Sequence, residues 1–245
     1  MRNDDSKPGA RVSHLFIGKN VAELFDAALK TIKRQLHPEY KLRIKGEKGN
    51  RIQGRDTLKR VLKSEVVFRG ANNTLIFEPG VTVKRCKIVF IGSDSTVVIG
   101  RNCLIKGRLS VTQGSTLLIG EGTSINGDGC FITCGEPSTR ITLGPGCLLA
   151  NPHIRTTDQH SIIDLETNTR INYAQDIVIE ERVWLAEGAK VMKGVTIGAG
   201  SIVGAGAIVT QDLPANSLCV GVPARAVKAN VSWRDELIYD DPFRY

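Results

Sequence analysis

An aliphatic residue recurs at every sixth position through six consecutive units in the C-terminal part of the chain. The units read IEERVW, LAEGAK, VMKGVT, IGAGSI, VGAGAI and VTQDLP, and they begin at Ile179, Leu185, Val191, Ile197, Val203 and Val209. An α-helix repeats about every 3.6 residues and an ordinary strand every second residue, so neither sustains this period. The pattern predicts short parallel strands joined by tight turns, three to a coil, in a triangular solenoid.

The same unit occurs earlier in the chain with longer spacers. FEPGV, IGRNC, IGEGT and LGPGC begin at Phe77, Ile99, Ile119 and Leu143, and these starts are 22, 20 and 24 residues apart. Each spacing exceeds three units of six by a few residues, which we assign to longer corners. The composition agrees with a thin core of stacked aliphatics, because there are 25 glycines for turns and only 5% aromatic residues.

The repeat divides the chain into three expected parts. They are a basic, partly helical N-terminal extension over residues 1–64, a β-helix domain over residues 65–230, and a C-terminal tail over residues 231–245. Asn20 and Glu23 form a capping pattern at the start of an apolar helical stretch, and a second short helix is expected from Asp56 through Leu62. The extension and the tail are expected to cover the open ends of the solenoid.

The positive charge is concentrated at the N-terminus. Residues 1–64 hold 16 Lys or Arg against 7 Asp or Glu, whereas the rest of the chain holds 17 against 18. A basic segment is compatible with nucleic acid, an anionic membrane surface or an acidic substrate. The segment has few aromatic residues and no groove-reading motif, which argues against nucleic acid. We expect it to hold an anionic acceptor, the alternative being a solvated basic face.

Six cysteines are present without any CxxC pair, and the N-terminus has no apolar secretory stretch. No run of apolar residues is long enough for a transmembrane helix. We therefore expect small, buried, reduced thiols in a cytoplasmic protein, with neither a disulfide framework nor a metal cluster. Cys103 and Cys147 occupy the same position of the repeat, which favours an inward-facing packing role for both.

The [LIV]-G-x-x-x-x units over residues 65–230 resemble the hexapeptide-repeat acyltransferases, whose fold is the left-handed parallel β-helix. The segments IRTTDQHSI (154–162), VWL (183–185), VGAGAIVT (203–210) and GVPAR (221–225) resemble the branch that O-acetylates sugars and polysaccharides. The resemblance implies acetyl-CoA as co-substrate and a homotrimer with each active site in a groove between two subunits. It also implies a glycan acceptor, such as a capsule or lipopolysaccharide hydroxyl.

Acetyl transfer from a thioester to a hydroxyl requires a base, and histidine suits this task because its pKa lies near neutral pH. The resemblance points to His160 as the general base in a direct transfer, with His153 as the nearest competitor. Asp158, Asp164 or a backbone carbonyl could orient the His160 ring. The indole N–H of Trp184 could stabilise the oxyanion, the alternative being a packing role at a subunit contact.

The resemblance also assigns residues to coenzyme A. Small residues on a flat face are expected to contact the pantetheine arm, namely Ala186, Gly204 and Ala205. Polar or basic residues are expected to contact the nucleotide end, namely Thr210, Arg225 and Lys228. The family usually has a basic residue after the threonine, and Gln211 departs from that pattern, which weakens the phosphate contact expected there.

Three other functions remain open from the sequence. One is N-acetylation of a nucleotide-linked amino sugar, or acetylation of a small molecule such as serine. A zinc carbonic anhydrase requires three imidazoles on one metal, yet only His153 and His160 lie in the repeat region, so no metal is expected. A non-catalytic scaffold is disfavoured by the combination of His160, Trp184 and the GVPAR segment.

Overall fold

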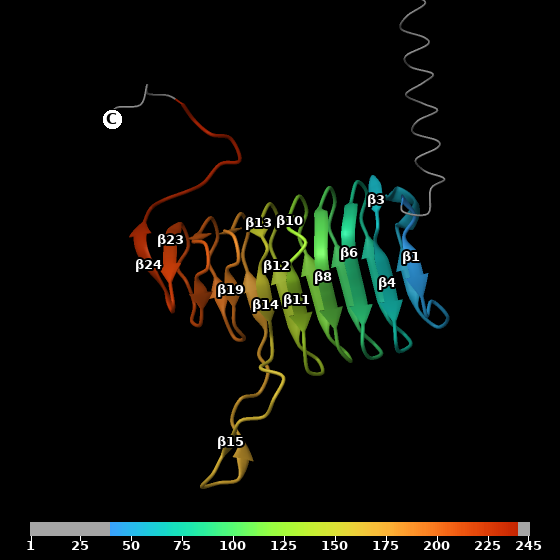
Figure 1. The fold of residues 1–245 in the computed structure, drawn as a ribbon, viewed down its shortest axis with the longest axis horizontal. Helices are drawn as coiled ribbons and strands as arrows, with labels where there is room; N and C mark the ends of the chain where they lie inside the picture. The colour runs from blue at the N-terminus through green and yellow to red at the C-terminus, as the bar shows by residue number, and fades with distance from the viewer. Residues whose placement is uncertain (1–39, 240–245) are drawn as a thin grey trace, which may run out of the picture.

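The structure, a computed structural model, describes residues 40–239, which form a parallel β-helix with its coils stacked side by side (Figure 1). Each coil contributes strands to three faces. A 15-stranded sheet makes two of the faces, and a seven-stranded sheet makes the third. The first two faces are continuous because β6 (Thr82–Phe90) and β8 (Leu104–Val111) bend around the corner between them and pair on both sides.

The strands are grouped here by face. Besides the first halves of β6 and β8, face 1 contains β3 (Arg60–Leu62), β10 (Ser124–Asn126), β13 (Leu148–Ala150), β18 (Trp184–Leu185), β21 (Ile202–Val203), β23 (Ser217–Gly221) and the antiparallel β24 (Ala224–Ala229). Besides the second halves of β6 and β8, face 2 contains β1 (Arg43–Lys45), β4 (Glu65–Phe68), β11 (Phe131–Cys134), β14 (His153–Arg155), β19 (Lys190–Val191) and β22 (Ile208–Val209). Face 3 contains β2 (Arg51–Gln53), β5 (Thr74–Phe77), β7 (Thr96–Ile99), β9 (Thr116–Ile119), β12 (Arg140–Leu143), β17 (Ile177–Ile179) and β20 (Thr196–Ile197).

The strand register confirms the predicted repeat. The four early unit starts, from Phe77 to Leu143, are successive Cα partners on face 3, and Leu143 in turn partners Ile179. Later in the chain Leu185 pairs with Val203 on face 1, and Val191 pairs with Val209 on face 2. All of these side chains are buried. The aliphatic residue of each unit therefore stacks on its counterpart one coil away.

The corner between faces 1 and 2 requires a backbone with positive φ. Gly107 has a φ of 82° inside β8, and a Cβ at this position would lie 2.4 Å from the Cβ of Cys130. Glycine is the residue that adopts this conformation without steric cost, and it also avoids the contact with the next coil. The glycine content expected from the repeat is thus used where the chain turns.

The six cysteines are all buried and free, as the sequence predicts. Cys103 and Cys147 lie at equivalent inward positions, and their Sγ atoms donate to the carbonyl oxygens of Gly120 and Glu180 at 3.1 Å. Burial raises the pKa of the Cys103, Cys130 and Cys147 thiols to about 11 and that of Cys134 to about 12. Burial also raises the pKa values of the Cys86 and Cys219 thiols.

The sheets begin before residue 65, the expected start of the β-helix. β1 pairs with β4, β2 with β5, and β3 with β6, so residues 43–62 already lie in the coils. The helix expected from Asp56 through Leu62 is wrong: the chain there forms one short 3₁₀ turn, η2 (Arg55–Thr57), and then β3. Pairing with the next coil overrides the local helical spacing of Leu58 and Val61. The helix expected after Asn20 lies outside the described residues.

The first described part of the tail packs on the side of the β-helix. Trp233 is buried, and its indole N–H donates to the carbonyl oxygen of Arg182 at 2.6 Å. The Arg182 guanidinium lies 5.1 Å from the centre of the Trp233 ring. This segment therefore covers part of a coil near face 1. No helix within residues 40–239 is long and apolar enough to cross a membrane.

The raised thiol pKa values lead to a labelling prediction. In the native protein near pH 8 all six cysteines should react with iodoacetamide far more slowly than an unfolded cysteine, because the thiolate is the nucleophile and the thiols are buried. Mass spectrometry of the alkylated chain measures this. The control is the same chain in guanidinium chloride, where six adducts are expected. Rapid alkylation of any cysteine in the folded protein would contradict this packing.

Candidate functional site

The main irregularity of the β-helix is an inserted loop over residues 157–175. The strand partners Leu148 and Trp184 lie on successive coils and are 36 residues apart in the sequence. The next pair of partners, Trp184 and Ile202, is only 18 residues apart. The loop leaves after β14 and returns before β17, and it carries the small antiparallel hairpin of β15 (Ile163–Asp164) and β16 (Thr169–Arg170). Figure 1 shows it projecting from the corner between faces 2 and 3.

Asn172 holds the base of this loop together. Its Nδ2 donates to the carbonyl oxygen of His160 at 2.8 Å and to Oδ2 of Asp158 at 2.9 Å. Its Oδ1 accepts the backbone N–H of Ile162 at 2.8 Å and Nε of Arg170 at 3.1 Å. Asn172 is buried. These bonds fix the backbone at His160 and leave its exposed imidazole without a hydrogen bond in the part of the chain described.

An ion pair ties the loop to the coil before it. Arg170 donates through both terminal nitrogens to the carboxylate of Glu136, at 2.8 and 2.6 Å, and also to the carbonyl oxygen of Asn172 at 3.0 Å. The Oγ1 of Thr157 donates to the same carboxylate at 2.5 Å. These hydrogen bonds, that from Arg170 first, lower the pKa of Glu136 to about 2. A two-pronged pair of this kind fixes orientation as well as distance.

The structure places both candidate orienting carboxylates in other contacts. Oδ2 of Asp158 accepts from Lys193 Nζ at 2.5 Å as well as from Asn172, and the Lys193 hydrogen bond is the main cause of the lowered Asp158 pKa. Oδ1 of Asp164 accepts the backbone N–H groups of Glu166 and Thr167 and so closes the hairpin turn. Neither carboxylate is hydrogen-bonded to the His160 ring within residues 40–239, so the orienting role of Asp158 remains a prediction.

The competing histidine lies in a different setting. His153 is exposed on face 2, where its ring is tilted against Phe131 with 5.7 Å between the ring centres. Its strand partners are Phe131 and Lys190. In residues 40–239 no three His, Cys, Asp or Glu side chains converge in a way that could hold a metal ion.

Trp184 lies half-buried on face 1. Its strand neighbours are Leu148 and Ile202, and its ring centre is 6.1 Å from that of Trp233 in the tail. Among the described residues the Trp184 indole N–H has no hydrogen-bond partner, whereas that of Trp233 is used by Arg182. The ring of Trp184 is therefore held by packing while its donor stays available.

The residues assigned to coenzyme A lie toward the C-terminal end of the solenoid. The N–H groups of Ala186 and Gly204 donate to the carbonyl oxygens of Val203 and Cys219, so they are used by the coil-to-coil ladder. The N–H of Ala205, at an exposed turn, has no partner within the described chain. Thr210, which directly follows the face 2 strand β22, is exposed, as are Arg225 and Lys228 on β24. Of the expected backbone donors, only that of Ala205 is free.

One chain does not bring His160 and Trp184 to the same place. His160 lies in the loop at the corner between faces 2 and 3, and Trp184 lies on face 1, which is the opposite side of a three-sided prism. The interior between them is filled by the aliphatic core. A site that uses both side chains therefore needs a second copy of the chain.

Sequence reasoning missed the group that holds the loop, namely Glu136, Arg170, Asn172 and Lys193. Arg170 is 34 residues from Glu136, and Lys193 is 35 residues from Asp158. No local spacing connects such positions, because the contacts join successive coils and an insertion. The one available signal is the cluster of polar residues within the interruption itself.

The chain is similar to known acetyltransferases. A sequence profile described as "Bacterial transferase hexapeptide (six repeats)" matches residues 176–211. A polysialic acid O-acetyltransferase of Neisseria meningitidis is 33% identical over 201 residues, which cover 71% of this chain and 93% of that protein. A polysialic acid O-acetyltransferase of Escherichia coli O1:K1 / APEC is 41% identical over 150 residues, or 59% of this chain; the match spans 48%, about half, of that protein's length.

Solved structures agree with these matches. The polySia specific acetyltransferase NeuO superimposes with a TM-score of 0.73 and 32% identity, covering 82% of this chain and 91% of that one. The polysialic acid O-acetyltransferase OatWY gives a TM-score of 0.70 and 25% identity, covering 82% and 90%. The likeness confirms the predicted left-handed β-helix.

The Glu136–Arg170 pair leads to a prediction about pH. Because the folded pKa of Glu136 is about 2 against an ordinary 4.5, the pair stabilises the loop above pH 4.5 and loses that contribution as pH falls toward 2. The protection factors of the amides within residues 157–175, which correct for the pH dependence of the intrinsic exchange rate, should therefore fall on acidification. Glu136→Gln should accelerate the same amides already at pH 7.

Glu78→Gln provides the matched control, since Glu78 pairs with the exposed Arg101 and both lie on coils other than those that hold the loop. This variant should leave exchange in the loop unchanged at pH 7. Equal exchange in Glu136→Gln and the wild type would show that the pair does not hold the loop.

Proposed function

We propose that the chain transfers acetyl from acetyl-CoA to a hydroxyl group of a saccharide. The chain belongs to the hexapeptide-repeat acetyltransferases and to their sugar O-acetyltransferase branch. The observation that carries this proposal is the match over 93% of the length of the N. meningitidis polysialic acid O-acetyltransferase. Two features of the site support it. His160 has a fixed backbone and an uncommitted ring, and Trp184 has an unused indole N–H.

The proposed reaction is a direct transfer. His160 accepts the hydroxyl proton as the acceptor oxygen attacks the thioester carbonyl, which forms the new C–O bond. The indole N–H of Trp184 donates to the oxyanion of the tetrahedral intermediate. Collapse breaks the C–S bond, and the leaving sulfur takes the proton from the imidazolium. The products are the acetyl ester, free coenzyme A and neutral His160.

Coenzyme A is proposed to lie along the C-terminal coils. The free N–H of Ala205 is a donor for an amide of the pantetheine arm, beside the small residues Ala186 and Gly204, which leave the surface low. Thr210, Arg225 and Lys228 are proposed to face the nucleotide end, where the two cations would pair with phosphate.

The proposed active site is shared between two copies. His160 of one chain would approach Trp184 and Ala205 of its neighbour, because a single chain holds them on opposite sides of the prism. A trimer with three such grooves is the assembly we propose. The projecting loop supports this arrangement, since it exposes Leu165, Ile171 and Tyr173, which are apolar side chains suited to a protein contact.

Two substitutions test the roles of the side chains. His160→Ala should lower kcat by about 10²- to 10⁴-fold, the usual contribution of general base catalysis. Trp184→Phe keeps a ring against Trp233 and removes the N–H, so kcat should fall by about 10²- to 10³-fold. The assay is coenzyme A release with acetyl-CoA and a panel of saccharides, including amino sugars. Trp233→Phe is the control and should keep wild-type kcat.

Equal coenzyme A release by His160→Ala and the wild type with every acceptor would overturn the proposed mechanism. A response confined to amino-sugar acceptors, with an amide as product, would instead assign N-acetylation.

Mixing the two inactive variants tests the shared site. When His160→Ala and Trp184→Phe chains are unfolded together and refolded, some grooves should receive an intact His160 from one copy and an intact Trp184 from the other. Activity should therefore rise well above that of either variant refolded alone. Absence of any recovery, with mixed oligomers confirmed by mass spectrometry, would place both residues in a site within one chain.

A further inference from the structure

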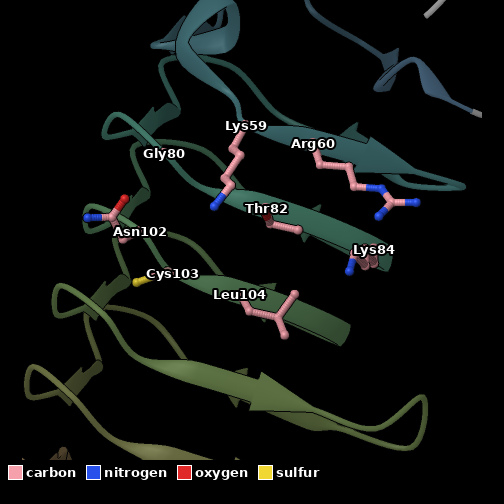
Figure 2. A pocket seen from close by; sticks show the side chains of 8 residues that line it. All are labelled: Lys59, Arg60, Gly80, Thr82, Lys84, Asn102, Cys103 and Leu104. Atoms are coloured by element: carbon pink, nitrogen blue, oxygen red, sulfur yellow. The ribbon is translucent and has the colours of Figure 1, made fainter. Parts of the chain in front are cut away.

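An open hollow of about 400 Å³ lies on the N-terminal coils of face 1, away from the proposed catalytic groups. It spans β3, β6 and β8 and the turns that precede them. Its lining residues are Lys59, Arg60, Gly80, Thr82, Lys84, Asn102, Cys103 and Leu104. Figure 2 shows Thr82 between Lys59 and Lys84, with Arg60 on the neighbouring strand.

The hollow is cationic. Three basic side chains line it, and no acidic residue does. Lys59 and Arg60 form no ion pair with any described residue. On face 2 of the same coils, Lys45 and Lys87 instead share the carboxylate of Glu65. Lys59 and Arg60, which are adjacent and have no counter-charge among residues 40–239, repel one another, so the arrangement favours an anionic ligand.

Neutral polar groups complete the lining. The Thr82 hydroxyl and the Asn102 side-chain amide have no hydrogen-bond partner among residues 40–239. Hydroxyl and amide groups of this kind hydrogen-bond to sugar hydroxyls, whereas the cations pair with carboxylates. The combination fits an acidic saccharide better than a simple inorganic anion.

The strand register connects this hollow to Trp184. Successive Cα partners on face 1 run from the hollow to the tryptophan as follows: Arg60, Thr82, Leu104, Ser124, Leu148 and Trp184. Neighbouring strands are about 4.8 Å apart, so the four steps from Thr82 to Trp184 cover about 19 Å. Between Thr82 and Trp184, this column of Cα partners holds no charged residue. The neighbouring column, two residues further along each strand, contributes Lys106. An anionic chain meets no carboxylate along these two columns.

The hollow and the groups proposed for coenzyme A lie on opposite sides of Trp184 along the solenoid axis. The groups proposed for coenzyme A lie from Ala186 toward the C-terminal end, whereas the hollow lies from Leu104 toward the N-terminal end. The two substrates would therefore approach Trp184 from opposite ends of the solenoid. The cations of the hollow are too far along the solenoid to serve the coenzyme A phosphates on this arrangement.

We infer that the hollow binds carboxylate groups of an anionic glycan, and that the acceptor runs from there along face 1 to the acetylation site beside Trp184. This inference rests on the proposed function, because it takes Trp184 as the site of transfer. It adds that the acceptor is an acidic oligosaccharide or polymer rather than a single sugar. A short acceptor reaches Trp184 or the hollow, and a longer one reaches both.

A binding experiment with polysialic acid fragments of increasing length tests this, with dextran as the neutral probe. The full chain and the variant Lys59→Gln/Arg60→Gln are titrated in the absence of acetyl-CoA. Wild-type affinity should rise with fragment length and fall with added salt. The double variant should bind the long fragments about tenfold more weakly, the effect of removing two exposed charge contacts. Its affinity should no longer rise with fragment length, because only the contacts near Trp184 remain.

Lys48→Gln/Arg69→Gln is the matched control, because it removes the same charge from exposed turns between faces 2 and 3. It should bind long fragments like the wild type. The inference is overturned if both double variants weaken binding equally, if fragments of all lengths bind alike, or if the wild type binds none of them.

His160→Ala separates this inference from the proposed function. It should bind long fragments normally while losing acetyl transfer. If transfer survives in His160→Ala but the length dependence vanishes in Lys59→Gln/Arg60→Gln, the hollow stands and the catalytic proposal fails. If transfer depends on His160 and the hollow variant still shows wild-type length dependence, the catalytic proposal stands and the hollow fails.

Discussion

Stacking of one aliphatic side chain on the same side chain of the next coil is the interaction on which this molecule depends. Leu149, Leu185 and Val203 form one such column, and each is wholly buried. To keep these contacts, every coil must repeat the backbone path of its neighbours, so the strands stay in register and bond to each other throughout. What can vary is left to the outward positions, the corners and the insertions, and the features that point to function lie there.

The same constraint decides how far the sequence predicts the fold. Where aliphatic and glycine positions recur together, as at Ile99 and Leu143, the register follows directly from the spacing. The first coils lack that glycine pattern, and Leu58, Val61 and Leu62 have the spacing of a helix face, so the start of the solenoid was expected too late. Only the neighbouring coil, which no local pattern describes, decides that these residues form a strand.

The candidate site shows a similar limit. The interruption of the repeat identifies the loop, because an insertion in a regular solenoid stands out in the sequence, and the resemblance to the acyltransferase family points to His160 within it. The partners that hold the loop do not stand out. Glu136 reaches Arg170 from an earlier coil, and Lys193 reaches Asp158 from a later one, so these pairs are adjacent only once the coils are stacked. The availability of the Ala205 N–H likewise follows from the hydrogen-bond ladder and not from residue type.

Because the coils stack at a uniform spacing, distances along the solenoid are multiples of one strand spacing. On face 1 the cationic hollow and Trp184 are separated by four strand spacings, and each coil between them contacts only the coils on either side. Gain or loss of one coil between Leu104 and Leu148 would move the two ends apart or together by about 4.8 Å without altering either. If the acceptor binds as proposed, the distance between its anchored part and the reacting hydroxyl would therefore change in steps of one coil during evolution, while the proposed chemistry at Trp184 stayed the same.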